Sequence, residues 1–140
     1  MNASRILMYA VAATCGVLLT ACAGSETDRE QLDLNTRQHV KAPIENAALL
    51  IRETHPAQYA VQITSGLPNG CASFERVEVS SEGRSFNVAV WNSLPADPRI
   101  ACTMIYRTTV NTAELGNALI PGQQYQVTIN DDTRLEFTAR

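Results

Sequence analysis

The sequence predicts an all-β protein in which residues 43–140 form a single, seven-stranded β-sandwich of two sheets. Three observations support this. Residues 43–140 contain no long apolar face with the 3.6-residue period of a helix. Short segments rich in Val, Ile, Thr, Tyr and Phe recur between turn residues instead. Several of these segments alternate apolar and polar residues, as expected where a sheet is buried on one face and solvated on the other.

The first 21 residues have the pattern of a signal peptide. Arg5 precedes a largely apolar run at 6–19, whose fourteen residues are fewer than the ~20 that a spanning helix needs. The run Leu19-Thr20-Ala21-Cys22 then resembles the lipobox of bacterial lipoproteins. This resemblance implies cleavage before Cys22 and acylation of that residue. The alternative is an ordinary secretory signal cleaved after an Ala-x-Ala-like site, which Ala21-Cys22-Ala23 could provide.

The lipobox resemblance also implies a location, namely the bacterial cell envelope, with the protein attached to the lipid bilayer through acylated Cys22. Several acyl chains anchor a protein stably where one would be marginal. Ala23, rather than Asp, follows the cysteine. In enterobacteria-like cells this resembles an outer-membrane address, on the periplasmic or the surface face.

Residues 22–42 are predicted to be a lipid-anchored flexible tether. Seven of the twenty residues at 23–42 are charged, and only Leu32, Leu34 and Val40 are sizeable apolar groups. Such a segment buries too little surface to offset the entropy of ordering it. The domain is therefore expected to begin at Pro43.

The seven strands are expected at residues 44–52, 58–65, 73–80, 85–92, 103–111, 124–130 and 133–138. In the second of them, Tyr59, Val61 and Ile63 share one face. Asn130-Asp131-Asp132 separates the last two strands, and Asn and Asp tolerate the positive φ of a tight hairpin. Residues 112–121 are ambiguous, because Thr112 could cap a single helical turn.

The charge of the exported chain argues against a nucleic-acid partner. Removing residues 1–21 takes away Arg5 and no acid, which leaves 10 basic and 14 acidic residues and a net charge of −4. Binding to nucleic acid needs a basic face, and none is visible.

The cysteines predict one disulfide. Cys15 leaves with the signal peptide and Cys22 is acylated, so Cys71 and Cys102 remain. An even pair in an exported chain is typical of a disulfide, with two free buried thiols as the alternative.

The stretch Leu119-Ile120-Pro121-Gly122-Gln123-Gln124-Tyr125 resembles the Leu-x-Pro-Gly-x-x-Tyr sequence that leads into the sixth strand of fibronectin type III domains. The resemblance implies an immunoglobulin/fibronectin III-like sandwich in which Gly122 and Tyr125 are structural. Tyr125 would form a tyrosine corner, with its hydroxyl bonded to the backbone a few residues upstream. The disulfide departs from the fibronectin pattern. The spacing of Trp91 from the cysteines does not fit the antibody pattern either.

Three other stretches resemble a family of small bacterial secreted or lipid-anchored domains of unassigned function. They are Gly66-Leu67-Pro68-Asn69-Gly70-Cys71, Ala101-Cys102-Thr103-x-Ile105-Tyr106 and Pro121-Gly122-x-x-Tyr125-x-Val127-x-Ile129-Asn130. The similarity covers most of residues 57–138. It implies a common fold and disulfide, and it implies no activity.

No catalytic residue, metal or cofactor is expected. His39 falls in the tether and His55 in a turn, and the chain has no His-x-x-x-His, Cys-x-x-Cys, Gly-x-Ser-x-Gly or Walker sequence. Asp131-Asp132 fits a hairpin turn better than a calcium site. Glu75 and Glu78 fit the solvated face of a strand better than the acid–base pair of a glycosidase.

The candidate binding surface is the end of the domain that the disulfide would hold together. Residues 67–70 lead directly into Cys71, and residues 92–101 lead into Cys102. Rigid loops at the end of a sandwich often carry recognition, and exposed Trp and Arg often anchor interfaces. The candidate binding residues are Leu67, Pro68, Asn69, Trp91, Asp97 and Arg99. Packing of Trp91 over the sheet edge is the alternative.

The expected function is therefore non-enzymatic. The protein would be a membrane-anchored, extracytoplasmic module that binds a protein or an envelope polymer through the disulfide-linked loops. Two alternatives stay open. One is an accessory or weak hydrolase acting on cell-envelope material, and the other is a purely structural envelope lipoprotein.

Overall fold

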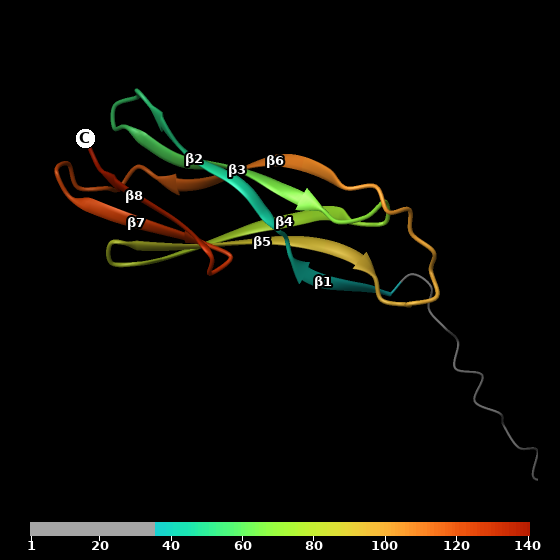
Figure 1. Cartoon of the computed structure of the whole chain (residues 1–140). Helices are drawn as coiled ribbons and strands as arrows, with labels where there is room; N and C mark the ends of the chain where they lie inside the picture. The colour runs from blue at the N-terminus through green and yellow to red at the C-terminus, as the bar shows by residue number, and fades with distance from the viewer. Residues whose placement is uncertain (1–35) are drawn as a thin grey trace, which may run out of the picture. The chain divides into compact units, whose positions relative to one another are not determined.

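Eight β-strands in two sheets make up residues 36–140, the part of the chain that this computed structural model describes (Figure 1). The all-β sandwich is thereby confirmed. The strands are β1 (Arg37–Lys41), β2 (Ile44–Arg52), β3 (Gln58–Leu67), β4 (Ser73–Glu82), β5 (Ser85–Pro95), β6 (Arg107–Gly116), β7 (Gln124–Ile129) and β8 (Thr133–Thr138). The predicted signal peptide and the predicted acylation site, Cys22, lie outside the described residues. Within residues 36–140, no helix has the length and apolarity to span a bilayer.

Strand β5 organises the larger of the two sheets. One edge of β5 pairs with β4 over residues 85–93. The other edge is shared, because β7 pairs with residues 85–88 and β1 with residues 91–95. Strand β8 then pairs with β7, and the second sheet has the order β2-β3-β6.

The pairing of β5 with β7 is parallel, whereas the other strand pairs are antiparallel. Immunoglobulin-type sandwiches consist of antiparallel sheets, so this pair departs from the expected topology. Parallel neighbours need a crossover connection, and here the chain crosses through β6 in the opposite sheet.

The core lies between the two sheets and follows the predicted alternation. Tyr59, Val61 and Ile63 of β3 are buried against side chains from β5 and β7. Aromatic rings close one end of the core. The ring of Phe137 lies 5.6 Å from that of Tyr59 and 5.8 Å from that of Tyr125. Stacking at this separation adds to the stability gained from burial.

Strand β6 begins later and ends later than the sequence predicts. It starts at Arg107 instead of residue 103 and continues to Gly116. The helical turn considered after Thr112 is not formed, because Thr112 and Ala113 pair with β3. Pairing with a neighbouring strand has therefore overridden a weak local helix signal.

Strand β1 corrects the predicted boundary of the tether. The sequence places residues 37–42 in the tether, whereas Arg37–Lys41 pair antiparallel with β5 and Ala42 is buried. The side chains of β1 are mostly exposed. The strand is therefore held chiefly by backbone hydrogen bonds to an available sheet edge, which the composition of the segment does not reveal.

Asn130 fills the gap between β1 and β7 along the shared edge of β5. Its Oδ1 accepts a hydrogen bond of 2.9 Å from the backbone N–H of Val90, and its Nδ2 donates one of 2.6 Å to the carbonyl of Ala42. Asn130 and Asp131 have positive φ values of 47° and 68°, as predicted for this hairpin. One side chain thus satisfies backbone groups that neither strand reaches.

Candidate functional site

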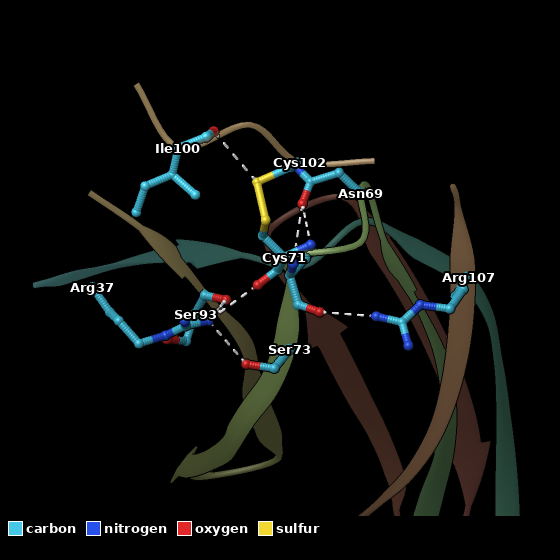
Figure 2. The surroundings of a disulfide bond; sticks show 9 residues. Arg37, Asn69, Cys71, Ser73, Ser93, Ile100, Cys102 and Arg107 are labelled. Atoms are coloured by element: carbon cyan, nitrogen blue, oxygen red, sulfur yellow. Dashed lines mark hydrogen bonds between the residues drawn. A yellow bond between two sulfur atoms is a disulfide. The ribbon is translucent and has the colours of Figure 1, made fainter. Parts of the chain in front are cut away.

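Cys71 and Cys102 form the predicted disulfide at one end of the sandwich, with their Cα atoms 5.5 Å apart (Figure 2). Two arginines reinforce this end. Arg37 of β1 donates to the carbonyls of Cys71 at 3.2 Å and Ser93 at 2.8 Å. Arg107 at the start of β6 donates to the carbonyl of Ala72 at 3.3 Å. The disulfide end is therefore held both covalently and by hydrogen bonds from β1 and β6.

A glycine allows the two disulfide-linked segments to approach closely. The N–H of Gly70 donates to the carbonyl of Thr103 at 2.8 Å. A β-carbon at position 70 would overlap the Thr103 hydroxyl. The absence of a side chain is what permits this contact.

Most of the predicted binding residues in the loops are buried or make hydrogen bonds within the domain. Leu67 is buried, and the Oδ1 of Asn69 accepts from the backbone N–H groups of Cys71 and Ala72 at 3.0 Å each. Asp97 accepts from the backbone N–H of Arg99 at 2.9 Å and also pairs with its guanidinium. The hydrogen bond to the Arg99 backbone is the main reason that the pKa of Asp97 is lowered.

Two loop residues remain at the surface of the disulfide end. Pro68 is half-buried, whereas the side chain of Arg99 is 65% exposed. Arg99 is therefore the most accessible of the predicted loop residues.

Trp91 lies on the outer face of the larger sheet, and not in the disulfide-linked loops. It is half-buried in β5, opposite Arg76 of β4 and Lys41 of β1. Its indole N–H donates to Glu78 Oε2 at 2.9 Å, and the Arg76 guanidinium lies 5.3 Å from the ring centroid. Trp91 is thus part of a polar cluster on an open sheet face.

His39, Glu75, Arg76, Glu78 and Trp91 together form what we term the Trp91 face. The Nδ1 of His39 donates to Glu75 Oε2 at 2.5 Å. Arg76 Nη1 contacts Glu75 Oε1 at 2.5 Å, and its Nε contacts Glu78 Oε1 at 2.7 Å. Three strands, β1, β4 and β5, therefore supply one continuous set of contacts.

A β-bulge explains why Glu75 and Arg76 can cooperate. Consecutive residues of a regular strand point to opposite faces of the sheet. The register of β4 against β5 shifts between Phe74 and Arg76, and such a bulge re-aims side chains. Phe74 and Val77 are three residues apart and would face opposite ways in a regular strand, yet both pack against the core. Two apolar residues at this odd spacing are the signal in the sequence that indicates a bulge.

The charges on the Trp91 face hold both carboxylates in the ionised form. The hydrogen bond from His39, with further help from Arg76, lowers the pKa of Glu75. Arg76 and then Trp91 lower the pKa of Glu78. A glycosidase needs one carboxylic acid with a raised pKa. Glu75 and Glu78 thus have the electrostatics of ion pairs and not those of a catalytic acid and base.

Among the recesses on the surface, two lie where their position bears on the site. One of about 200 Å³ adjoins the Trp91 face and is lined in part by Lys41, Glu78 and Asp131. One of about 570 Å³ lies beside the β2–β3 turn, where His55 and Leu119 contribute to its lining. Among residues 36–140, no group of three or more His, Cys, Asp or Glu side chains is arranged to hold a metal ion.

Tyr125 makes the hydrogen bond of a tyrosine corner. Its hydroxyl accepts from the backbone N–H of Ile120 at 2.9 Å, and Gly122 between them has a positive φ of 81°. This φ favours glycine. The contact is the one that the fibronectin-like stretch implied.

Comparison with known proteins places these features in a shared region. The ORF11 β-sandwich domain family matches residues 61–139, which include both disulfide cysteines, Trp91 and Tyr125. A protein of Herpetosiphon aurantiacus, described as an uncharacterized 10.2 kDa protein in the HgiCIIM 5′ region, is 27% identical over 88 residues. These residues cover 63% of this chain and 90% of that protein. No solved structure matches the chain.

Proposed function

This chain belongs to the ORF11 β-sandwich domain family, and from that premise we propose that it acts as a binding module without catalytic activity. Acylated Cys22 would hold it at the cell envelope, outside the cytoplasm. The ligand would be a protein or an envelope polymer. The proposed binding surface is the Trp91 face, in place of the disulfide-linked loops that the sequence favours.

The observation that carries this proposal is the fixed arrangement of side chains around Trp91. Trp and Arg are the residues that most often dominate binding energy at interfaces. Here Arg76 lies over the ring of Trp91, and Glu78 contacts both residues. Side chains that are ordered before binding lose less entropy when a partner arrives. A spacer without a ligand has no need of such an arrangement.

Photo-cross-linking in the native envelope tests the binding surface. A photoreactive residue replaces Asn87, an exposed β5 residue that lines the recess beside the Trp91 face. The matched control replaces Thr112, an exposed residue of β6 in the opposite sheet. We expect a discrete cross-linked species from position 87 only. The same products from both positions, or none, would favour a structural spacer.

The dependence on Trp91 provides the second part of this test. In the protein labelled at position 87, Trp91→Ala should reduce the cross-linked species about thirtyfold, which corresponds to the loss of a hot-spot residue. Arg76→Gln serves as a second variant, because Arg76 is half-buried on the outer face of the sheet and its loss should leave the fold intact. Normal melting with undiminished cross-linking in both variants would exclude the Trp91 face.

A separate experiment tests the anchor. The protein should incorporate labelled fatty acid when expressed in a bacterial host, and Cys22→Ser should abolish the label. A Cys22→Ser protein that still carries lipid would contradict acylation at this residue.

A further inference from the structure

An apolar segment stands exposed beside the disulfide. Met104, Ile105 and Tyr106 are 89%, 59% and 50% exposed. They are consecutive, and they make up half of the six large hydrophobic residues that are exposed in residues 36–140. Contiguous apolar side chains on a surface commonly mark a place of contact with a protein or a membrane.

The fold holds this segment outward by contacts on both sides. Cys102 is fixed by the disulfide, and the carbonyl of Thr103 accepts from Gly70. The hydroxyl of Tyr106 donates to Glu45. Met104 and Ile105 therefore project from a positioned backbone between two fixed residues.

The chain enters the domain at this same end. The carbonyl of Thr36 accepts a 2.9 Å hydrogen bond from Ala96, in the loop that leads to Cys102. Arg37 then contacts Cys71. Thirteen residues, 23–35, separate Thr36 from Cys22, and fully extended they span at most about 45 Å. A bilayer that holds Cys22 is therefore within reach of the disulfide end.

The charges around the segment suit an anionic lipid surface. Arg107 directly follows Tyr106, and Arg99 lies three residues before Cys102 and is largely exposed. Arginines near a membrane attract anionic headgroups, and tyrosine favours the interface between lipid and water. Asp97, which pairs with Arg99, and Glu45, which accepts from Tyr106, offset part of this positive charge, so that Arg37, Arg99 and Arg107 outnumber the carboxylates named at this end by one.

We propose that Met104, Ile105 and Tyr106 form a second contact with the lipid bilayer, with Arg99 and Arg107 beside anionic headgroups. This inference rests on the proposed acylation of Cys22, which keeps the disulfide end near the membrane. The contact orients the domain so that the disulfide end faces the lipid. The β2–β3 turn, at the other end of β3, then points away from the bilayer.

Cross-linking to lipid tests the contact in the acylated mature protein. The protein is inserted in vesicles of phosphatidylethanolamine and phosphatidylglycerol, with a photoreactive residue at Met104 or, as the control, at Val110. Val110 is 59% exposed, as is Ile105, but lies on the outer face of β6. We expect lipid adducts by mass spectrometry to be at least about tenfold more abundant from position 104. Equal adducts from the two positions would overturn the proposal.

The mature Cys22→Ser chain lacks the proposed acylation site, so any binding of this variant to vesicles reports the second contact alone. A negative result for the contact can therefore be distinguished from a negative result for acylation. The variant should still sediment with the anionic vesicles, and Met104→Ser with Ile105→Ser should weaken that binding at least about tenfold. Val110→Ser should leave the binding unchanged. No binding of the Cys22→Ser chain to the vesicles would overturn the contact, whatever the labelling of Cys22 shows. If the chain forms a dimer in the absence of vesicles, and Met104→Ser with Ile105→Ser dissociates that dimer, the segment binds a second copy of the chain and the proposal is overturned.

Discussion

The phenol ring of Tyr106 lies across the backbone of Gly66, so close that a β-carbon at position 66 would overlap the tyrosine hydroxyl. That hydroxyl donates to Glu45 on the neighbouring strand β2. Gly70 and Thr103 make a second contact of the same kind. The glycines before Cys71 and the residues after Cys102 are therefore the two sides of one closely packed surface, which the disulfide closes.

The first prediction concerns the titration of Tyr106. Its pKa is raised above the ordinary value of 10.0, mainly because its hydroxyl donates to Glu45. Gly66→Ala should displace the ring from Glu45, so the pKa should fall towards the ordinary value. Stability should change by no more than about 1 kcal/mol, because the far end of an exposed side chain can move. NMR titration of the ring carbons measures the shift, with Glu45→Gln as the matched variant. A Tyr106 pKa that is unaffected by Gly66→Ala would contradict the contact.

The disulfide should make a large contribution to stability. Cys71 and Cys102 are 31 residues apart in the sequence. For a loop of this length the chain-entropy model gives about 3–4 kcal/mol. Replacing both cysteines by alanine should lower the free energy of unfolding by this amount in urea denaturation. Mass spectrometry of the purified, non-reduced protein provides the direct check, and two free thiols in it would refute the bridge.

Tyr125→Phe should destabilise the domain by about 1–3 kcal/mol, because the backbone N–H of Ile120 loses its acceptor. The exposed Tyr106→Phe is the comparison, since it removes a hydroxyl from the surface instead. Denaturation midpoints measure the difference, and we expect a larger decrease for Tyr125→Phe than for Tyr106→Phe. If Tyr125→Phe melts like the unaltered protein, Tyr125 contributes only as a packed ring.

Asn130→Ala should loosen strand β1. The change leaves the N–H of Val90 and the carbonyl of Ala42 without their side-chain partners, at a cost of about 2–3 kcal/mol. Asn130→Gly accommodates the positive φ and removes the same amide, which separates backbone strain from lost hydrogen bonds. Hydrogen exchange should accelerate in Arg37–Lys41 in both variants. Unchanged protection of the β1 amides from hydrogen exchange would show that the backbone hydrogen bonds to β5 hold the strand without Asn130.

Acid should weaken the Trp91 face. The pKa of Glu75 lies below its ordinary value of 4.5, with the His39 hydrogen bond as the main cause. A lowered carboxyl pKa contributes stability above the unfolded-state pKa, and that stability is lost as the pH falls through the folded-state value. The free energy of unfolding should therefore fall less steeply with decreasing pH, below about pH 5, in Glu75→Gln than in the unaltered protein. Urea midpoints measured from neutral pH downwards test this, and parallel curves for the two proteins would count against it.

The features predicted correctly from the sequence are those that local chemistry controls. The strands at 44–52 and 133–138 have the predicted bounds, because alternation and flanking turn residues are local signals. The disulfide was predicted from Cys71 and Cys102, the two cysteines outside the predicted signal peptide and anchor, and the structure contains it. The Tyr125 hydrogen bond followed from a motif of seven consecutive residues.

Contacts between distant segments could not be predicted from the sequence, because they depend on how the strands pair in three dimensions. Strand β7 pairs with only residues 85–88 of β5, so residues 91–95 of the same edge are free to pair with β1. The composition of residues 37–41 does not predict this pairing. The Trp91 face needs His39 from β1, a bulge in β4 and Trp91 from β5. Each of these residues alone resembles an ordinary solvated side chain. Their arrangement as a group depends on strand order and register, which non-local backbone pairing sets.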